Sequence, residues 1–161
     1  MKWIIAILLC LNFLSIPEIS EIRRLYPYAS NSESATLELN SKLSDVNNES
    51  NKTLVAYKGA SIAMSAKFTK KIKDKISDLK EGTKLIEYAI LSEPKDVEIR
   101  LIRLSIQENA PKIANYYKNK KEDATFIIVH YKEQPISLKE YLKSFILQSK
   151  SFTEQEKQTL K

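Results

Sequence analysis

Apolar residues recur at helical spacing along most of the chain beyond residue 16. Ile19, Ile22, Leu25 and Tyr26 fall on one face of a helix, and later segments repeat this pattern. Polar breaks rich in Asn, Ser, Pro and Lys separate the segments. The pattern therefore predicts an all-α fold, with about eight or nine helices joined by short polar connections.

Two segments, 97–107 and 125–131, carry a mixed signal. Both are short apolar runs, which fit a buried helix or a β-strand by periodicity alone. The second is also rich in β-branched residues, which favour strands. We predict helix for both, because neither is flanked by a glycine-containing turn and the chain has only two glycines for hairpins.

Three local signals predict where helices begin and end. Ser137 followed by Glu140, and Thr153 followed by Glu156, have the spacing of capping boxes at the starts of the last two helices. Pro27 is predicted to end or kink the first helix, because proline removes a hydrogen-bond donor and clashes with the preceding turn.

Residues 1–16 have the pattern of a secretory signal peptide. One lysine precedes an apolar run that is interrupted only by Asn12 and Ser15 and is shorter than the roughly 20 residues of a membrane-spanning helix. We predict cleavage within 15–20, an exported protein (periplasmic or secreted) and a single all-helical domain over residues 17–161. An uncleaved anchor and a buried first helix are the alternatives.

The composition excludes several kinds of chemistry. The chain has 161 residues with one Cys, one His and two isolated Gly, which excludes a disulfide framework, a cysteine-based zinc site, a P-loop and a dinucleotide-binding turn. The adjacent Glu122 and Asp123 are expected to diverge on a helix, and His130 is interpreted as structural. We therefore predict no enzymatic activity, no metal, no cofactor and no small-molecule substrate.

Lysines are concentrated in residues 67–80, within a chain of net charge +6. If this segment is helical, its lysines flank an apolar stripe formed by Phe68, Ile72, Ile76 and Leu79. Such a surface is suited to anionic lipid headgroups. The candidate residues for binding an anionic surface are Lys70, Lys71, Lys73 and Lys75.

The alternative for this segment is structural: the stripe packs on the body of the protein and the lysines are solvated. We favour this alternative because Asp74 and Asp78 interrupt the positive charge. Nucleic acid is not an expected partner, since export would separate the protein from it and no ladder of basic and aromatic residues is visible.

Arg100, Arg103 and Gln107 share one face of the segment 97–107. Two arginines on one helical face form a forked surface that recognises carboxylates, such as a peptide end, so these three residues are candidates for binding a partner protein. In the structural alternative, which we favour, the arginines pair with Glu93, Glu98 or carboxylates of another helix and clamp adjacent hairpins together.

Residues 57–94 resemble a degenerate tetratricopeptide-type helical hairpin. The first helix of this segment is rich in small residues, and the second carries Gly82, Ile86 and Ala89, followed by Pro94 in the loop. Residues 91–111 are also similar to small exported bacterial proteins of this helical type. The resemblance implies an array of antiparallel hairpins, forming a right-handed superhelix or a compact bundle, and a protein-binding groove.

Two functional hypotheses follow from these patterns. The first is a non-enzymatic exported helical-repeat protein that acts as an interaction or scaffold module for an unidentified protein partner. The second is a peripheral membrane-surface protein, held by an uncleaved amino-terminal anchor or by the lysine-rich segment 67–80.

Overall fold

The computed structural model describes residues 16–160, which contain helices and no strands. The prediction of an all-α fold is confirmed, and both 97–107 and 125–131 are helical. The predicted signal segment lies almost wholly outside the described residues. The helices are α1 (Ile19–Ala29), α2 (Glu33–Lys42), α3 (Lys52–Ser65), α4 (Ile72–Ser92), α5 (Val97–Asn109), α6 (Lys120–His130), α7 (Ile136–Gln148) and α8 (Glu154–Gln158), with short 3-10 turns η1 (Lys112–Ala114) and η2 (Tyr131–Glu133).

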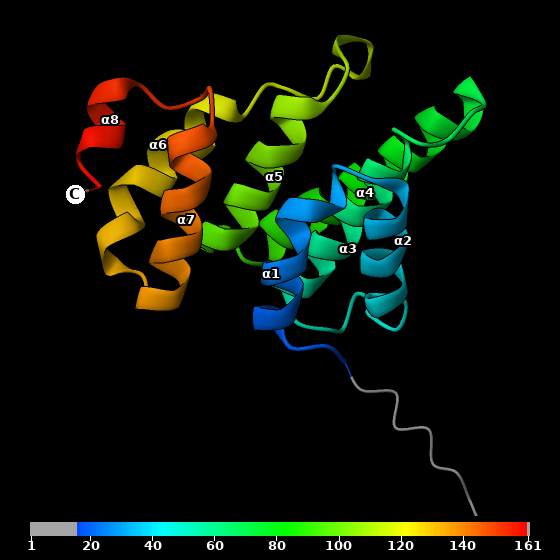
Figure 1. The fold of residues 1–161 in the computed structure, drawn as a ribbon, viewed down its shortest axis with the longest axis horizontal. Coiled ribbons are helices and arrows are strands. Elements are labelled where there is room, and N and C mark those ends of the chain that lie inside the picture. The colour runs from blue at the N-terminus through cyan, green and yellow to red at the C-terminus, as the bar shows by residue number, and fades with distance from the viewer. Residues whose placement is uncertain (1–15, 161) are drawn as a thin grey trace, which may run out of the picture.

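Helix α5 lies at the centre of the molecule, with α1–α4 on one side and α6–α8 on the other (Figure 1). Every residue from Val97 to Gln107 is buried. Ile99, Ile102 and Ile106 belong to a core shared with α1–α4, whereas Leu101 and Leu104 belong to a second core shared with α6–α8. A helix that is apolar on two opposite faces loses its amphipathic signal, which explains why this segment also resembled a strand.

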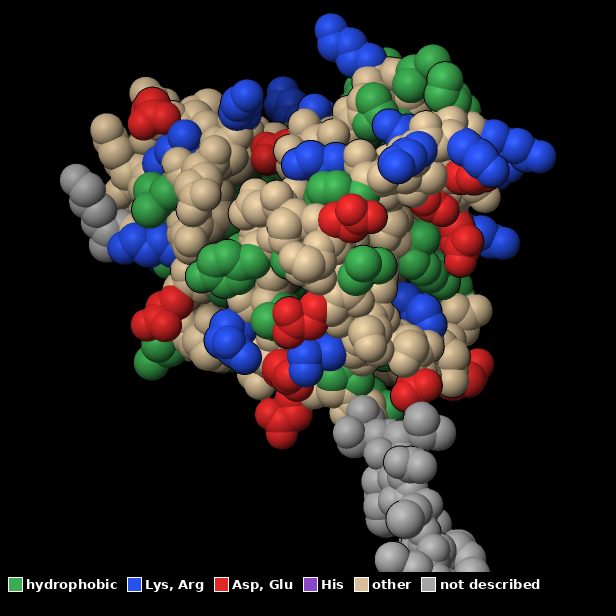
Figure 2. Space-filling view, turned by 45° about the vertical axis from the view of Figure 1, so that its right-hand side comes forward, with side chains coloured by type: hydrophobic (Ala, Val, Ile, Leu, Met, Phe, Trp, Pro, Cys, Tyr) green, Lys and Arg blue, Asp and Glu red, His purple; other side chains and the backbone are tan. Residues whose placement is uncertain are grey.

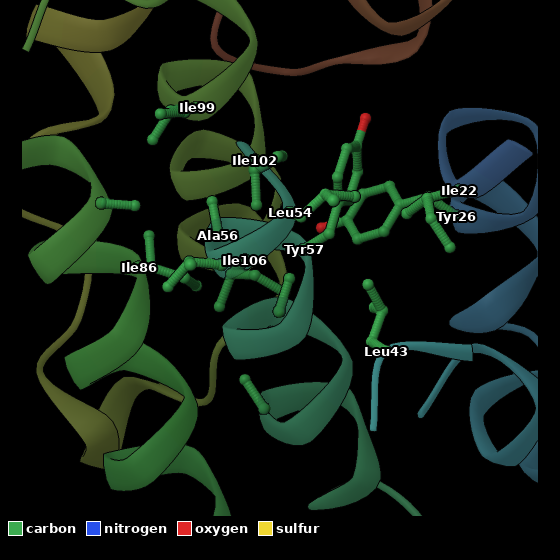
Figure 3. Packing of buried hydrophobic residues seen from close by; sticks show 14 of the residues in the cluster. Ile22, Tyr26, Leu43, Leu54, Ala56, Tyr57, Ile86, Ile99, Ile102 and Ile106 are labelled. Carbon is green, nitrogen blue, oxygen red and sulfur yellow. The ribbon is translucent and has the colours of Figure 1, made fainter. Parts of the chain in front are cut away.

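The first core is organised around Tyr57 of α3. Figure 3 shows Ile22 and Tyr26 of α1 on one side of Tyr57. Ile102 of α5 belongs to the same core. The rings of Tyr26 and Tyr57 meet edge to face, with 5.0 Å between their centroids. This geometry is favourable for aromatic pairs and fixes α1 against α3.

The two glycines of the chain allow α3 and α4 to pack closely. A Cβ atom on Gly59 would lie 2.5 Å from the carbonyl oxygen of Gly82, and a Cβ atom on Gly82 would lie 2.6 Å from the backbone nitrogen of Ala63. Gly59 also faces Ile86, whereas Ala63 faces Gly82, so the two helices are antiparallel. The close contact between antiparallel backbones therefore requires glycine at both positions.

The predictions of helix boundaries have mixed outcomes. The capping box of Thr153 and Glu156 is confirmed at the start of α8. The box of Ser137 and Glu140 is wrong: α7 begins at Ile136, directly after Pro135, so Ser137 already lies inside the first turn. Pro27 does not end α1 at once, because the helix continues for two more residues to Ala29.

Candidate functional site

Helix α4 extends beyond its partner α3. It has 21 residues, whereas α3 has 14, and at 1.5 Å per residue the difference corresponds to about 10 Å. Because the two helices are antiparallel, the excess lies at the start of α4, which projects from the body at the upper right of Figure 1. We call residues 67–80 the lysine tip.

Two isoleucines of the lysine tip are uncovered. The side chain of Ile72 is 76 % exposed and that of Ile76 is 56 % exposed, whereas Leu79 packs against the first core. Lys70, Lys71 and Lys73, proposed from the sequence for an anionic surface, are exposed around these isoleucines, and Lys75 is half-buried. The favoured structural alternative is therefore wrong for Ile72 and Ile76, whereas Phe68 is half-buried and Leu79 packs on the body.

Hydrogen bonds hold the connection that leads into the tip. The hydroxyl of Thr69 donates to Asp78 at 2.8 Å and also lies 3.0 Å from the carbonyl oxygen of Ser65. Lys67 donates to the carbonyl oxygen of Ser30 at 2.7 Å. These contacts link the tip to α1 and α3, so that Ile72 is presented on an anchored element.

The beginning of α4 concentrates positive charge. Lys71 occupies the N-cap position without a side-chain cap, and Asp74 is the only acidic residue of the first turn. Because the start of a helix already carries a partial positive charge, lysines at this position oppose helix stability and strengthen the local positive potential. In Figure 2, blue side chains gather along the upper edge and the upper right of the molecule, whereas red ones are more frequent below.

The arginines predicted to bind a partner are buried in α5 and paired with carboxylates of other helices. Arg103, which is 3 % exposed, binds both carboxylate oxygens of Asp123 at 2.7 Å and reaches Glu87 at 3.2 Å. Arg100 donates to Asp123 at 3.0 Å and to Glu122 at 2.9 Å. The geometry favours the structural interpretation, in which these residues connect α5 to α4 and α6.

The expectation that Glu122 and Asp123 diverge is wrong, since both carboxylates bind the same guanidinium nitrogen of Arg100. Burial raises the pKa of Asp123, an effect opposed by Arg103 and Arg100. The hydrogen bond from Arg100 lowers the pKa of Glu122, which is more exposed. Asp123 could not be identified from the sequence as the partner that both arginines share. The spacing of Glu122 and Asp123 gives their directions around α6, but it does not show that α5 packs beside them.

Gln107 and Glu98 complete the polar positions of α5. The side-chain amide of Gln107 is buried and makes no hydrogen bond, so it lies in the interior and not on a surface. On the opposite side of the helix, Glu98 binds Arg23 through two hydrogen bonds of 2.7 and 2.8 Å and accepts a third from Tyr57 at 2.6 Å. Glu98 thus binds side chains of α1 and α3, and it does not pair with Arg100 or Arg103.

An open depression of about 490 Å³ lies beside Arg100, between α5 and α6. The ring of Phe126 faces the Arg100 guanidinium at 4.2 Å and the ring of His130 at 4.3 Å. Nδ1 of His130 lies 2.8 Å from a carboxylate oxygen of Glu133. His130 therefore contacts Phe126 and Glu133 at the edge of the depression, whose lining also includes Lys121 and Thr125.

Sequence reasoning also missed a second basic segment, residues 110–121, which we call the basic loop. It contains four lysines and no acidic residue. It connects α5 to α6 and includes the first two residues of α6. A count of charges within this window would have revealed it.

Residues 16–160, which the structure describes, contain no cluster of His, Cys, Asp or Glu that could hold a metal ion. None of their helices is long and apolar enough to cross a membrane.

No protein-family model matches the chain, and the searches of curated proteins and of solved structures also return no match.

Proposed function

We propose that the protein is a non-enzymatic helical binding module that attaches peripherally to an anionic membrane surface through the lysine tip. The observation that carries this proposal is the exposure of Ile72 and Ile76 among the lysines at the free end of α4. Apolar side chains that solvent surrounds on a projecting helix, with lysines beside them, match the chemistry of a headgroup layer above hydrocarbon.

The energies of such an attachment are adequate for reversible binding. A lysine close to an anionic bilayer contributes about 1 kcal/mol, and the tip holds six lysines against two aspartates. Complete burial of an isoleucine side chain contributes about 1.5–3 kcal/mol. The two terms reinforce each other, because the lysines draw the isoleucines to the depth at which they can leave water.

The identity of the basic residues favours lipid over a structured acidic partner. All six basic residues of the tip are lysines. Lysine is a flexible point charge that suits a diffuse layer of anions, whereas arginine has the fork that recognises a carboxylate in a fixed geometry. The tip is also convex, while protein recognition of a protruding isoleucine would require a complementary pocket on the partner.

Two other parts of the proposal come from the sequence patterns. Export rests on the signal-like residues 1–16. A tetratricopeptide-like arrangement is supported by the antiparallel pair of α3 and α4, whose close contact uses Gly82. A protein partner in place of a membrane is the other function open to such a module, and the vesicle experiment distinguishes the two.

The proposal is tested by sedimentation of the purified full chain with phospholipid vesicles. We expect binding to vesicles of phosphatidylcholine with 30 % phosphatidylglycerol, and weak or no binding to phosphatidylcholine alone. The triple variant Lys70→Gln, Lys71→Gln, Lys73→Gln should bind the anionic vesicles on the order of 100-fold more weakly. Added salt should also weaken binding by the wild-type chain.

The matched control carries the same change of charge at another place. Lys132, Lys139 and Lys143 lie on η2 and α7, away from the tip. Their triple replacement by Gln should weaken vesicle binding much less than the tip variant. Equal losses in both triple variants would mean that net charge, and not the tip, governs binding. No binding of the wild-type chain to anionic vesicles would overturn the membrane proposal.

Export has its own measurement. When the full chain is expressed in a bacterium that has a periplasm, we expect the protein in the periplasmic fraction, with an amino terminus created by cleavage after a position within 15–20. A cytoplasmic chain that retains Met1 would contradict the export proposal and leave the vesicle result unaffected.

A further inference from the structure

We propose that the basic loop, residues 110–121, is a second membrane contact, so that the protein docks on an anionic bilayer at two points and in one orientation. This inference rests on the proposed function of the lysine tip and adds a second, separate element to it. The occupant is the same anionic bilayer, and the residues that meet it are Ile113 and Tyr117 with their neighbouring lysines.

The basic loop exposes apolar side chains to solvent. Ile113 is 89 % exposed, more than any other exposed large hydrophobic residue of residues 16–160, and Tyr117 is 50 % exposed. Lys112 adjoins Ile113, and Lys118 adjoins Tyr117. The loop thus repeats, on a different backbone structure, the combination of uncovered apolar groups and lysines found at the lysine tip.

The loop is anchored to the core and is not a free connection. The hydroxyl of Tyr116 donates to Glu87 at 2.6 Å, and Glu87 also accepts a hydrogen bond from the buried Arg103. A short 3-10 turn precedes Asn115, whose φ of 52° lies in the left-handed region. Because Tyr116 is held inward, its neighbour Tyr117 is presented outward by a fixed backbone.

The two basic segments project from the same edge of the molecule. The α5–α6 connection forms the top of Figure 1, and the start of α4 projects beside it at the upper right. After a turn about the vertical axis, the same upper edge remains the one where blue side chains gather (Figure 2). A single flat surface above this edge is positioned to meet both segments.

The charge of the chain is concentrated in these two segments. The lysine tip has six lysines and two aspartates, and the basic loop has four lysines and no acid. Each segment has a formal charge of +4, so together they exceed the net charge of +6 of the whole chain. The remainder is slightly negative, and an anionic bilayer therefore attracts this edge and repels the rest.

A bilayer also explains the types of exposed residues. Tyrosine is enriched at membrane interfaces because its ring is apolar and its hydroxyl remains in contact with water. Two separated convex projections suit a continuous, deformable surface, since headgroups can rearrange around each of them.

The inference is tested with single tryptophans as reporters of membrane insertion. The only tryptophan of the chain is Trp3, so all variants are made in a Trp3→Phe background of the full chain. Ile72→Trp reports on the lysine tip and Ile113→Trp on the basic loop. Ile136→Trp is the matched control, because Ile136 is 73 % exposed and lies at the start of α7, at the lower edge of Figure 1.

Anionic vesicles should shift the emission of both Ile72→Trp and Ile113→Trp to shorter wavelength by about 10 nm and leave Ile136→Trp unchanged. A shift of Ile72→Trp alone would overturn the second contact while supporting the proposed function. The absence of any shift, together with the absence of vesicle sedimentation, would overturn both. A shift at all three positions would overturn a defined orientation.

A second measurement avoids the bulky reporter. Ile113→Ser should weaken sedimentation with anionic vesicles by about 10-fold, since it removes an apolar side chain from the bilayer. Ile136→Ser, at a position of similar exposure, should change it less than twofold. Equal effects of the two variants would contradict a specific contact by the basic loop.

Discussion

Helices α4 and α5 both place basic residues beside apolar ones, yet the two sets have opposite environments. Arg100 and Arg103 of α5 are buried, and each binds at least two carboxylates. The lysines at the start of α4 are mostly exposed around uncovered isoleucines. Similar patterns in the sequence thus produced a set of interior ion pairs in one helix and an exposed cationic surface in the other.

The difference follows from what lies opposite each helix. α5 is enclosed by helices on all sides, and its polar positions occupy two lines along it. Arg100 and Arg103 face α6 and α4, while Glu98 and Ser105 face Arg23 of α1 and the tyrosines of the first core. Among the residues that the structure describes, no helix lies opposite the start of α4, because α3 is too short to reach it. Charges of the interior maintain the fold, whereas those of the tip are available for another surface.

The largest expected effect concerns the phenols around α5. Burial raises the pKa of Tyr26, Tyr57, Tyr116 and Tyr141, half of the eight tyrosines, so the folded protein keeps these protons when the unfolded chain releases them near pH 10. This stability is fully present below pH 10 and is lost as the pH rises above it. At pH 11 the loss should reach about 5 kcal/mol.

Urea unfolding between pH 9 and 11 measures this loss, and absorbance at 295 nm follows the phenolates. Tyr141→Phe removes one buried phenol and should make the alkaline decline less steep. Tyr28→Phe serves as a control because Tyr28 is 66 % exposed, and it should leave the slope unchanged. Ionisation of all eight phenols before unfolding would show that the interior does not retain these protons.

The next largest effect is expected from removing the carboxylate that the two arginines share. Asp123→Ala leaves the buried guanidinium groups of Arg100 and Arg103 with only the more exposed Glu122 and Glu87 as partners, and breaking a buried ion pair in this way costs about 3–5 kcal/mol. The free energy of unfolding in urea provides the measurement. Glu122→Ala is the matched control, since it removes the neighbouring carboxylate, 57 % exposed, and should cost less than about 1 kcal/mol. Equal losses in the free energy of unfolding for Asp123→Ala and Glu122→Ala would mean that the burial of Asp123 does not make its ion pairs more important for stability than those of Glu122.

A smaller effect tests the packing that determines which part of α4 projects. Gly82→Ala places a methyl group against the backbone of α3, which cannot move aside as a side chain can. The resulting overpacking should cost about 1–3 kcal/mol, although alanine is the better helix former by about 1 kcal/mol. Ser77→Ala, in the exposed part of the same helix, lacks this conflict and should be neutral or stabilising. Thermal unfolding of the two variants would reveal this difference in sign.

The all-α class and most of the helices could be predicted from helical periodicity, because a helix that packs on a core carries its apolar residues on one face. The scarcity of glycine correctly favoured helix over strand at 97–107 and 125–131. The start of α7 was missed because the spacing of Ser137 and Glu140 satisfies a capping box, whereas the structure has Pro135 at the N-cap position, two residues before Ser137.

The candidate site was less predictable, because exposure depends on the lengths of helices that pack together. The sequence placed Lys70, Lys71 and Lys73 on a candidate surface, but the uncovering of Ile72 follows from the shortness of α3. In the same way, Arg103 could be assigned to a carboxylate of another helix, yet the choice of Asp123 requires knowing that α6 lies against α5. Pairwise packing in three dimensions is the information that periodicity lacks.

The smallest expected effect on stability comes from the lysine tip. The triple variant Lys70→Gln, Lys71→Gln, Lys73→Gln removes positive charge from the positive end of a helix. Its free energy of unfolding in urea should therefore equal that of the wild type or exceed it by up to about 0.5 kcal/mol. Asp74→Asn removes the only acidic residue of that turn and should shift stability by a similar amount in the opposite direction. A loss of more than about 1 kcal/mol in the lysine variant would show that these residues maintain the fold, as the arginines of α5 do. An unchanged stability combined with weakened vesicle binding would separate a surface kept for binding from charges kept for structure.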